Sequence, residues 1–506
     1  MFRIFGPPGT GKTTSLLNRI DQALEQGVAP EKIAFLAFTR KAANEARERA
    51  AVRFKLDPEK DLFFFRTIHS LALAMTDIRA EQIMGYQHYK ELEKATGVLL
   101  SEGASSSPVD DDFDINSRTS NPIISLINLA RLRKVPLRDQ YNQSRVGDSW
   151  TTVHYVSEAL KNYKQANDVY DFTDLLEYFT LNHDKFCPSF DLCFLDEAQD
   201  LSPLQWDIAH VLDHKSKKMF VAGDDDQAIY KWAGADVEHF INLNGDAEIL
   251  SQSYRVPREV HKLAETVVTR IRRRYPKKYE PKDVKGKVER VYSTSDVDMS
   301  KGSWLILAQA GYQLQPIYEE LKSSGYLFNY RGRRSIGENL SLAVNGWEGL
   351  RKGKKLEARI ARIIYSFMSS GSRIARGYKK LPNIEENDLV SLDDLIQNHG
   401  LLATKCMIWS EAMDKIPTTE RAYVTALLRR GEKFNRAPRI SVSTIHASKG
   451  GEADNVVLLT DLSPAADQAL SENPDEVHRT FYVGITRSRE NLYLVEPDLT
   501  SRSYYL

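Results

Sequence analysis

Eight residues near the start of the chain determine how the rest of it is interpreted: Gly6-Pro7-Pro8-Gly9-Thr10-Gly11-Lys12-Thr13. They match the pattern G-x-x-x-x-G-K-[ST], whose glycines let backbone N–H groups close around phosphate oxygens where a side chain would collide. Lys12 supplies a positive charge for the β- and γ-phosphates, and the Thr13 hydroxyl can ligate Mg²⁺. We therefore predict a nucleotide site that runs through residues 6–13 and into Thr14.

The residues on both sides of this loop predict a strand before it and a helix after it. Phe2-Arg3-Ile4-Phe5 is short and mostly apolar, and residues 13–25 form a helical pattern whose N-terminus would face an anion. The next apolar run, residues 33–38, is continuous, as expected of a strand buried on both faces of a parallel sheet. Strands and helices that alternate in this way predict a parallel α/β core.

The length and the rhythm of the chain predict two such cores. At 506 residues the chain is too long for one hydrophobic core. A second set of short apolar runs begins at residue 288, and two mostly helical stretches interrupt the α/β pattern. The predicted parts are a first motor domain (residues 1–71 and 165–250), its helical insertion (72–164), a second motor domain (251–336 and 439–506) and its helical insertion (337–438).

Composition narrows the class of protein. Hydrophobic residues make up 42% and charged residues 27% of the chain, and the formal net charge is zero. No run of about 18 apolar residues could span a bilayer, and the first residues lack a signal peptide, so we expect a cytoplasmic protein without a membrane partner. Cys187, Cys193 and Cys406 form no C-x-x-C pair, which disfavours structural zinc, iron–sulfur clusters and a disulfide framework.

A pair of carboxylates follows the apolar run 190–195. In an α/β sheet, ligands bind at the carboxyl ends of the strands, which is where Asp196 and Glu197 fall. Asp196 can hold Mg²⁺ opposite Thr13, and Glu197 can polarise an attacking water. The alternative is an acidic helix start, which the helix dipole favours in any protein.

Residues 222–235, Ala-Gly-Asp-Asp-Asp-Gln-Ala-Ile-Tyr-Lys-Trp-Ala-Gly-Ala, form the most distinctive stretch. Three successive aspartates followed by glutamine are poor packing material, so a functional role is favoured. Gln227 could sense a γ-phosphate. Trp232 could stack on a nucleic-acid base, although a buried tryptophan is an equal alternative.

These two stretches, DEAQD at 196–200 and GDDDQAIYKWAGA at 223–235, resemble the signature of UvrD/Rep-like superfamily 1 DNA helicases. Six further motifs resemble the family in the family's own order: 37–43 (AFTRKAA), 67–70 (TIHS), 171–176 (DFTDLL), 252–255 (QSYR), 444–452 (TIHASKGGE) and 482–487 (YVGITR). Two positions depart from the family pattern, because Arg40 replaces a usual Asn and Gly451 replaces a usual Leu.

The resemblance implies two RecA-like motor domains and assigns roles to particular residues. Tyr254 would stack on adenine, Arg255 and Arg487 would reach the γ-phosphate as arginine fingers, and Glu452 would belong to the ATP site. Residues implied in DNA contacts are Phe38, Thr39, Arg40, His69, Trp232, Thr444 and His446. For His446 a link between its motif and the ATP site is the alternative, and we assign it no proton transfer.

The function implied is an ATP- and Mg²⁺-dependent DNA helicase that moves 3′→5′ on single-stranded DNA, in replication or repair. Two alternatives stay open: a translocase that strips proteins from DNA without unwinding it, and a regulatory ATPase that gates a protein partner. Single strands and single-strand–duplex junctions are the expected substrates, with single-strand-binding or replication and recombination proteins as candidate partners. We expect a monomer.

Three further expectations concern the limits of the resemblance. Family members carry a glutamine-containing segment before the P-loop that reads adenine, whereas here only Met1 to Phe5 precede it, so we expect loose selectivity among nucleotides. The second insertion is smaller than is usual in the family and the chain ends soon after the apolar run 492–495, so we expect a compact enzyme, encoded by a phage or plasmid and working in the host cytoplasm. Residues 271–279 interleave basic and aromatic side chains, which suits either DNA contact or a solvated helix end.

Overall fold

The computed structural model describes residues 1–37, 40–101, 121–144, 146–382, 384–497 and 500–506. Two compact units divide the chain: residues 1–285, 468–486 and 506 form the first, and residues 286–467 and 487–505 form the second. The predicted boundary after residue 250 differs from this division. Residues 251–285 group with the first unit: Ser253 and Tyr254 are hydrogen bonded to the P-loop, and Tyr275 and Lys277 contact Asp225. Residues 468–486, predicted in the second motor domain, also group with the first unit.

The first unit is built on a six-stranded sheet in which every neighbouring pair of strands is parallel. The strand order is β3-β2-β4-β5-β1-β6, so β5 lies between β4 and the strand that leads into the P-loop. The strands are β1 (Phe2–Phe5), β2 (Ile33–Ala37), β3 (Phe65–Thr67), β4 (Phe190–Leu195), β5 (Ser216–Gly223) and β6 (Ala247–Ile249).

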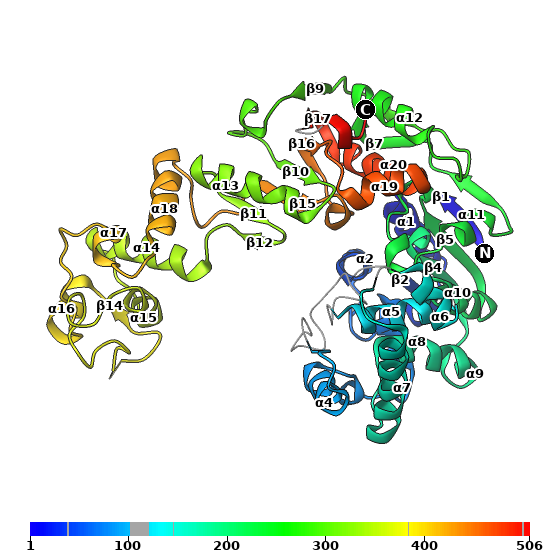
Figure 1. Cartoon of the computed structure of the whole chain (residues 1–506), viewed down its shortest axis with the longest axis horizontal. Helices are drawn as coiled ribbons and strands as arrows, with labels where there is room; N and C mark the ends of the chain where they lie inside the picture. The colour runs from blue at the N-terminus through cyan, green and yellow to red at the C-terminus, as the bar shows by residue number, and fades with distance from the viewer. Residues whose placement is uncertain (38–39, 102–120, 145, 383, 498–499) are drawn as a thin grey trace. The chain divides into compact units, whose positions relative to one another are not determined.

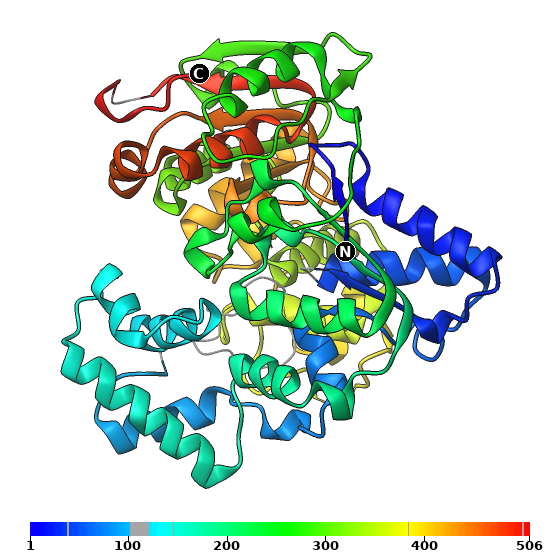
Figure 2. The same cartoon turned by 90° about the vertical axis from the view of Figure 1, so that its right-hand side faces the viewer.

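Helices cover both faces of this sheet, as the continuous apolar runs predict. Ile4 and Phe5 are both fully buried but belong to different hydrophobic clusters, because successive strand residues face opposite sides. One cluster includes α1 and α2, the blue helices that lie side by side in Figure 2. The helices on the two faces are α1 (Lys12–Glu25), α2 (Arg40–Phe54), α3 (Ile68–Met75), α8 (Phe172–Leu181), α9 (His183–Phe186), α10 (Pro203–His214) and α11 (Val237–Asn242).

Between β3 and β4 the described residues contain helices and no named strand. Four of these helices have a hydrophobic core of their own, in which α4 and α5 each pack against α7. They are α4 (Tyr86–Thr96), α5 (Pro122–Leu132), α6 (Leu137–Gln143) and α7 (Trp150–Asn167). This separate core agrees with the predicted helical insertion at residues 72–164, whose bounds stay a prediction.

Two further segments complete the first unit. A small parallel pair joins β7 (Gln252–Pro257) to β8 (Glu280–Lys282), and α12 (Arg258–Val268) packs against α20 (Pro474–Ile485). Short 3₁₀ helices connect the larger elements: η1 (Pro30–Lys32), η2 (Ala80–Gln82), η3 (Ala198–Asp200), η4 (Asp225–Gln227) and η5 (Lys231–Ala233).

The second unit contains a seven-stranded sheet with the order β12-β11-β15-β10-β16-β17-β9. Its pairs are parallel except for the hairpin of β11 and β12. The strands are β9 (Lys287–Val291), β10 (Trp304–Ala308), β11 (Phe328–Tyr330), β12 (Arg333–Arg334), β15 (Ile440–Thr444), β16 (Ala453–Leu459) and β17 (Ser488–Val495).

Helices also predominate in the long connection between β12 and β15. One hydrophobic cluster runs from this connection into the sheet, so the two share a core. The helices of this connection are α14 (Glu338–Arg351), α15 (Ala358–Ser366), α16 (Leu392–Asn398), α17 (Trp409–Ala412) and α18 (Thr418–Arg430), with a pair of short strands, β13 (Leu356–Glu357) and β14 (Leu389–Val390). A further helix, α13 (Gln315–Ser323), lies between β10 and β11. The remaining elements are η6 (Thr294–Asp296), η7 (Gly311–Leu314), η8 (His446–Ser448), η9 (Thr500–Arg502) and α19 (Pro464–Glu472), which crosses the division between the units.

The predicted fold class, α/β with two parallel sheets, is confirmed. The strands predicted from apolar runs are present with small shifts at their ends, whereas β6, β7, β8, β11, β12, β13 and β14 were not predicted. Across the described residues, every helix is too short or too polar to cross a bilayer.

Candidate nucleotide site

Three strands of the first sheet, β4, β5 and β1, are neighbours and end at the same edge. Because all three are parallel, the segments that follow them meet there: the P-loop after β1, Asp196 after β4 and Asp224 after β5. A hydrogen bond from Gly6 N to Gly223 O, 3.0 Å long, joins two of these segments. The sheet thus brings together motifs that lie about 200 residues apart in the chain.

The P-loop backbone has the curvature that a phosphate cradle requires. Gly9 and Gly11 have φ angles of 73° and 78°, which L side chains rarely adopt. A Cβ at Gly6 would lie 1.9 Å from Cγ of Lys12, so the lysine stem passes directly over this glycine. The Lys12 ammonium donates to Gly6 O at 3.0 Å and lies 3.6 Å from Oε1 of Glu197.

Two oxygen donors suited to Mg²⁺ lie together beside the loop. The hydroxyl of Thr13, in the first turn of α1, donates to Oδ2 of Asp196 at 2.6 Å. Hard divalent cations prefer such hydroxyl and carboxylate oxygens, and Mg²⁺ is typically held by one or two protein oxygens together with substrate phosphates. The donor set therefore fits a Mg²⁺–nucleotide complex.

The environment of Asp196 disfavours its charge. Burial raises the pKa of the Asp196 carboxyl to about 6, and the neighbouring carboxylate of Glu197 adds to the shift. Lys12 and the hydrogen bond from Thr13 act in the opposite direction. A divalent cation beside this carboxylate would favour its ionised form.

Glu197 has an unusual backbone conformation. Its φ of 56° lies in the left-handed region, which costs roughly 1–2 kcal/mol for a residue with a Cβ. Its carboxylate is partly exposed and accepts a hydrogen bond from Nε2 of Gln199, whose Oε1 accepts from the backbone N–H of Asp224. A glutamine thus connects the carboxylate pair to the segment after β5.

The segment at β7 lies against the P-loop within the same unit. The backbone N–H of Tyr254 donates to Gly9 O at 2.8 Å, and the Ser253 hydroxyl donates to Pro8 O at 2.7 Å. A Cβ at Gly9 would lie 2.3 Å from Cβ of Arg255. The glycine is therefore required by this close approach as well as by its backbone angle.

A polar pocket of about 510 Å³ opens beside the loop. The ring of Tyr254 is 72% exposed and forms part of its wall, so a flat face is available for a base. The other lining residues come from the loop and from one face of α1: Thr10, Gly11, Thr14, Ser15, Asn18, Arg19 and Gln22.

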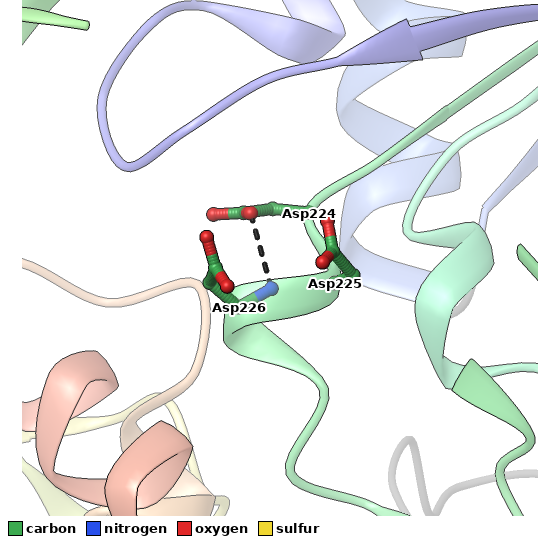
Figure 3. A group of neighbouring side chains, drawn as sticks. All are labelled: Asp224, Asp225 and Asp226. Atoms are coloured by element: carbon green, nitrogen blue, oxygen red, sulfur yellow. Dashed lines mark hydrogen bonds between the residues drawn. The ribbon is translucent and has the colours of Figure 1, made fainter. Parts of the chain in front are cut away.

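The three aspartates after β5 are buried, and so is Gln227. Figure 3 shows Asp224, Asp225 and Asp226 close together, with the backbone N–H of Asp226 directed at the Asp224 carboxylate. Nε2 of Gln227 donates to Oδ2 of Asp224 at 2.6 Å. The Asp224 carboxylate thus accepts hydrogen bonds from two later residues of the same loop, Asp226 and Gln227, and stabilises the conformation of that loop.

The residues of the first unit that are expected to contact DNA differ in whether the structure describes them and in how exposed they are. Phe38 and Thr39 lie outside the described residues, and Arg40 begins α2 with a half-buried side chain. His69 lies in the first turn of α3, with its ring centroid 6.2 Å from that of Phe172. Trp232 is 47% exposed, which rules out the buried alternative for this side chain.

The second unit carries the other predicted site residues. The guanidinium of Arg487 donates to Gly451 O at 3.4 Å, and Glu452 forms an ion pair with Arg489. Thr444 ends β15, and its hydroxyl accepts a hydrogen bond from the backbone N–H of Ala447, the residue after His446 in η8. Burial, assisted by Lys449, lowers the pKa of His446 to about 4, so its imidazole is neutral near pH 7.

Sequence reasoning missed several residues that hold this site together. The motifs that contain Gln199 and Ser253 assign no role to either residue, although their side chains connect separate segments. Lys277 was read as a DNA contact or as part of a solvated helix end, yet it is buried among carboxylates. The basic composition of residues 272–278 was the only general signal, and because these residues form no helix, their spacing does not show which of them face the acidic cluster.

Comparison with known proteins agrees with these motifs. The sequence model of the UvrD/REP helicase N-terminal domain matches residues 2–248, and that of the UvrD-like helicase C-terminal domain matches residues 414–496. A solved arterivirus helicase, nonstructural protein 10, aligns over 99% of this chain and 60% of its own at 12% identity, but the TM-score of 0.34 is too low to bear on the fold.

Two relatives are each named ATP-dependent DNA helicase PcrA. The one from Leuconostoc citreum is 28% identical over 296 residues, which cover 56% of this chain and 39% of the relative. The one from Bacillus subtilis (strain 168) is 26% identical over 360 residues, which cover 64% and 47%. The chain thus spans less than half the length of these relatives. With both family domains matched in order and the P-loop motifs assembled at one sheet edge, the chain belongs to the UvrD/Rep-like family of superfamily 1 helicases.

Proposed function

We propose that this chain is an ATP-dependent motor that moves along single-stranded DNA and unwinds duplex ahead of it. The observation that carries the proposal is the contact of Thr13 with Asp196, beside Lys12 and Glu197, at one edge of a parallel sheet. Such a set of residues is suited to phosphoryl transfer to water. Membership of the UvrD/Rep-like family supports DNA as the track.

Each residue of the first unit would act on ATP in a distinct way. The P-loop N–H groups and Lys12 would hold the phosphates, and Thr13 with Asp196 would hold Mg²⁺, which neutralises phosphate charge when bound. Glu197 would orient the attacking water and accept its proton. Tyr254 would stack on the base, and its exposed ring supports this role.

The residues that sense the γ-phosphate complete the proposed site. Gln227 lies in the buried loop after β5, and Arg255 follows the backbone contact between β7 and the P-loop. Arg487 and Glu452 belong to the second unit, and their roles rest on the resemblance of their motifs alone. An arginine finger contributes on the order of 10³ to 10⁵ in rate.

The DNA contacts are proposed from the same motifs. Arg40 and His69 would meet the strand in the first unit, as would Phe38 and Thr39, and Thr444 and His446 would do so in the second. Trp232 has the strongest physical support, because nearly half of its side chain is exposed and an exposed indole can stack on a base. We also propose 3′→5′ movement, a role in replication or repair, a cytoplasmic location and a monomeric working state.

The test uses the purified chain, with Lys12→Ala as the inactive control. ATP hydrolysis is measured with and without single-stranded DNA, and unwinding is measured on forks with a single 3′ or 5′ tail. The proposal expects DNA-stimulated hydrolysis and unwinding of the 3′-tailed fork. DNA-stimulated hydrolysis without unwinding would favour a protein-displacing translocase, whereas hydrolysis indifferent to DNA would overturn both DNA functions and favour a regulatory ATPase.

A further inference from the structure

A single lysine contacts all three of the consecutive aspartates. The ammonium of Lys277 lies 3.1 Å from an oxygen of Asp224 and 2.6 Å from oxygens of both Asp225 and Asp226. The side chain of Lys277 is 1% exposed, and the three carboxylates are equally buried. An unpaired charge would be very costly at this depth, so the cluster depends on its basic partners.

The arrangement explains why three carboxylates can lie so close together. Their oxygens lie within 4.8 Å of one another, a spacing at which a metal ion could bind. The Lys277 ammonium already contacts all three groups, and Arg274 makes a second, two-pronged contact with Asp226 at 2.7 and 2.8 Å. In this cluster the positive charge that neutralises the aspartates therefore comes from the side chains of Lys277 and Arg274, not from a bound metal ion.

The neighbouring charges and the burial of the cluster also shift the pKa values of Lys277, Asp226 and Asp225. Burial opposes the charged form of Lys277, but the three aspartates outweigh this effect and raise its pKa. Burial acts against Asp226 too, yet Lys277 and Arg274 lower its pKa overall. For Asp225 burial prevails over the pull of Lys277 and raises the pKa to about 6.

One oxygen of Asp224 faces Lys277 and the other faces Gln227. Lys277 approaches Oδ1, while Nε2 of Gln227 donates to Oδ2 at 2.6 Å. The backbone N–H of Gln227 also donates to Asp224 O at 2.9 Å. The Asp224 carboxylate thus contacts both Lys277 and Gln227, the glutamine proposed to sense the γ-phosphate.

The segment that carries Lys277 is itself fixed to the P-loop strand. The ring of Tyr275 stacks on Phe5, the residue before Gly6, at a centroid distance of 4.0 Å and an interplanar angle of 7°. The backbone N–H of Tyr275 donates to Asp225 at 2.7 Å. The lysine is therefore placed relative to the P-loop as well as to the aspartates.

Helix α20 holds the same two segments together. The buried Arg479 donates to Asp225 O at 2.9 Å and to the backbone oxygen of Arg273. The carboxylate of Asp475 accepts from the backbone N–H groups of Arg272 and Arg273 at 3.0 and 2.9 Å. Three stretches, at 224–227, 272–277 and 475–479, thus form one polar cluster.

We propose that Lys277 is a positioning residue: it is the internal cation that assembles the three aspartates, and through Asp224 it holds Gln227 in the orientation that ATP hydrolysis requires. The consequence for hydrolysis rests on the proposed function, whereas the consequence for assembly does not. The proposal also gives the run at 271–279 a role inside the protein, because Arg274 and Lys277 both face carboxylates.

The experiment replaces the lysine by an uncharged side chain of similar length. Lys277→Met removes one cation from the cluster, and Lys277→Met with Asp225→Asn restores the original balance while keeping an oxygen that can accept from Tyr275. Lys278→Met is the matched control, because Lys278 is the next residue and is exposed. Thermal melting, the KM for ATP and kcat are measured for each full-length protein.

Lys277→Met is expected to melt several degrees below the wild type, with a kcat at least ten-fold lower and a KM for ATP within about three-fold. The double variant is expected to recover most of the melting temperature and part of kcat, and the control to behave as the wild type. A parallel change in kcat and KM, or a similar loss in Lys278→Met, would overturn the positioning role.

A double variant that melts no higher than Lys277→Met would overturn charge compensation, and this comparison holds even when the single variant is too unstable to assay. A wild type that hydrolyses no ATP would overturn the proposed function instead. In that case the melting temperatures still decide whether Lys277 assembles the aspartates.

Discussion

The hydroxyl of Thr13 lies 2.6 Å from Oδ2 of Asp196, although 183 residues separate the two in the chain. The contact results from the strand order, because β4 and β1 are both neighbours of β5 and all three are parallel. Taken alone, Asp196 could simply be an acidic residue at a helix start. Its contact with the Thr13 hydroxyl favours a shared role for the two side chains in holding a metal ion. A hydroxyl and a carboxylate side by side at a P-loop are suited to one divalent cation.

Asp196→Asn should therefore impair hydrolysis through the metal rather than through the fold. We expect the rate to fall by about 10²-fold or more, because a charged ligand to the cation is lost, and the Mg²⁺ concentration for half-maximal rate to rise. A Mg²⁺ titration of ATPase activity measures both. Asp191→Asn, a change on the same strand at a residue paired with Lys217, should leave the titration unchanged.

Glu197→Gln tests the assignment of the general base. The amide keeps the size of the side chain but cannot take a proton, so we expect nucleotide affinity to stay within a few-fold while turnover drops by about 10² to 10⁴. Binding of a fluorescent ATP analogue and steady-state hydrolysis separate the two quantities. If binding is lost together with turnover, Glu197 has a structural role instead.

Gly9→Ala should weaken ATP binding by displacing β7 from the loop. The added Cβ would lie 2.3 Å from Cβ of Arg255 and 2.9 Å from the Ser253 hydroxyl oxygen, in a backbone with a φ of 73°. Gly27→Ala is the matched control, because Gly27 has a φ of 85° and nothing within 4 Å of the position that a Cβ would take.

Both glycine variants carry the same left-handed strain of roughly 1–2 kcal/mol. Only Gly9→Ala should raise the KM for ATP, by about ten-fold or more. An equal effect in both variants would mean that backbone strain, and not the contact with β7, controls the site.

Much of this candidate site could be predicted because its residues belong to short motifs of consecutive residues. The P-loop, the strand before Asp196 and the stretch around Gln227 are each recognisable over a few residues, and parallel strands bring their ends together without further information. The apolar run at 33–38 likewise predicted β2, since both faces of that strand are buried. Local patterns therefore gave the sheet core and the phosphate end of the site.

The remaining features depend on pairings between distant residues. Nothing in the four residues QSYR shows that Ser253 bonds to Pro8 O, and nothing at Lys277 shows that its partners lie about 50 residues earlier. Short strands such as β6 and β8 have too few apolar residues to produce a periodic signal. These features required the three-dimensional structure.

Trp232→Ala should separate movement on DNA from the stability of the protein. Because the indole is 47% exposed, its removal should lower the free energy of unfolding by about 1 kcal/mol or less, against roughly 3–5 kcal/mol for the fully buried Trp206. We expect DNA-stimulated hydrolysis and unwinding to be lost while basal hydrolysis remains. Partial recovery in Trp232→Phe would support stacking, whereas a melting temperature as low as that of Trp206→Ala would show a packing role.

His446 should make the protein sensitive to acid. Its pKa is lowered to about 4 by burial and by Lys449, from an ordinary value of 6.5, so the unfolded chain takes up a proton on this residue in a range where the folded chain does not. The contribution to stability is complete above pH 6.5 and is lost as the pH falls from about 6.5 towards 4. The slope cannot exceed about 1.4 kcal/mol per pH unit for one proton.

Urea unfolding at pH 7, 6 and 5 measures this slope. His446→Gln should reduce the fall in unfolding free energy across that range, because the amide does not titrate. His154→Gln is the control for the histidine-to-glutamine replacement itself, since His154 is exposed on α7. An unaltered slope in His446→Gln would show that the imidazole is solvated. It would then be able to carry a positive charge towards a DNA phosphate near neutral pH, in place of the neutral contact expected here.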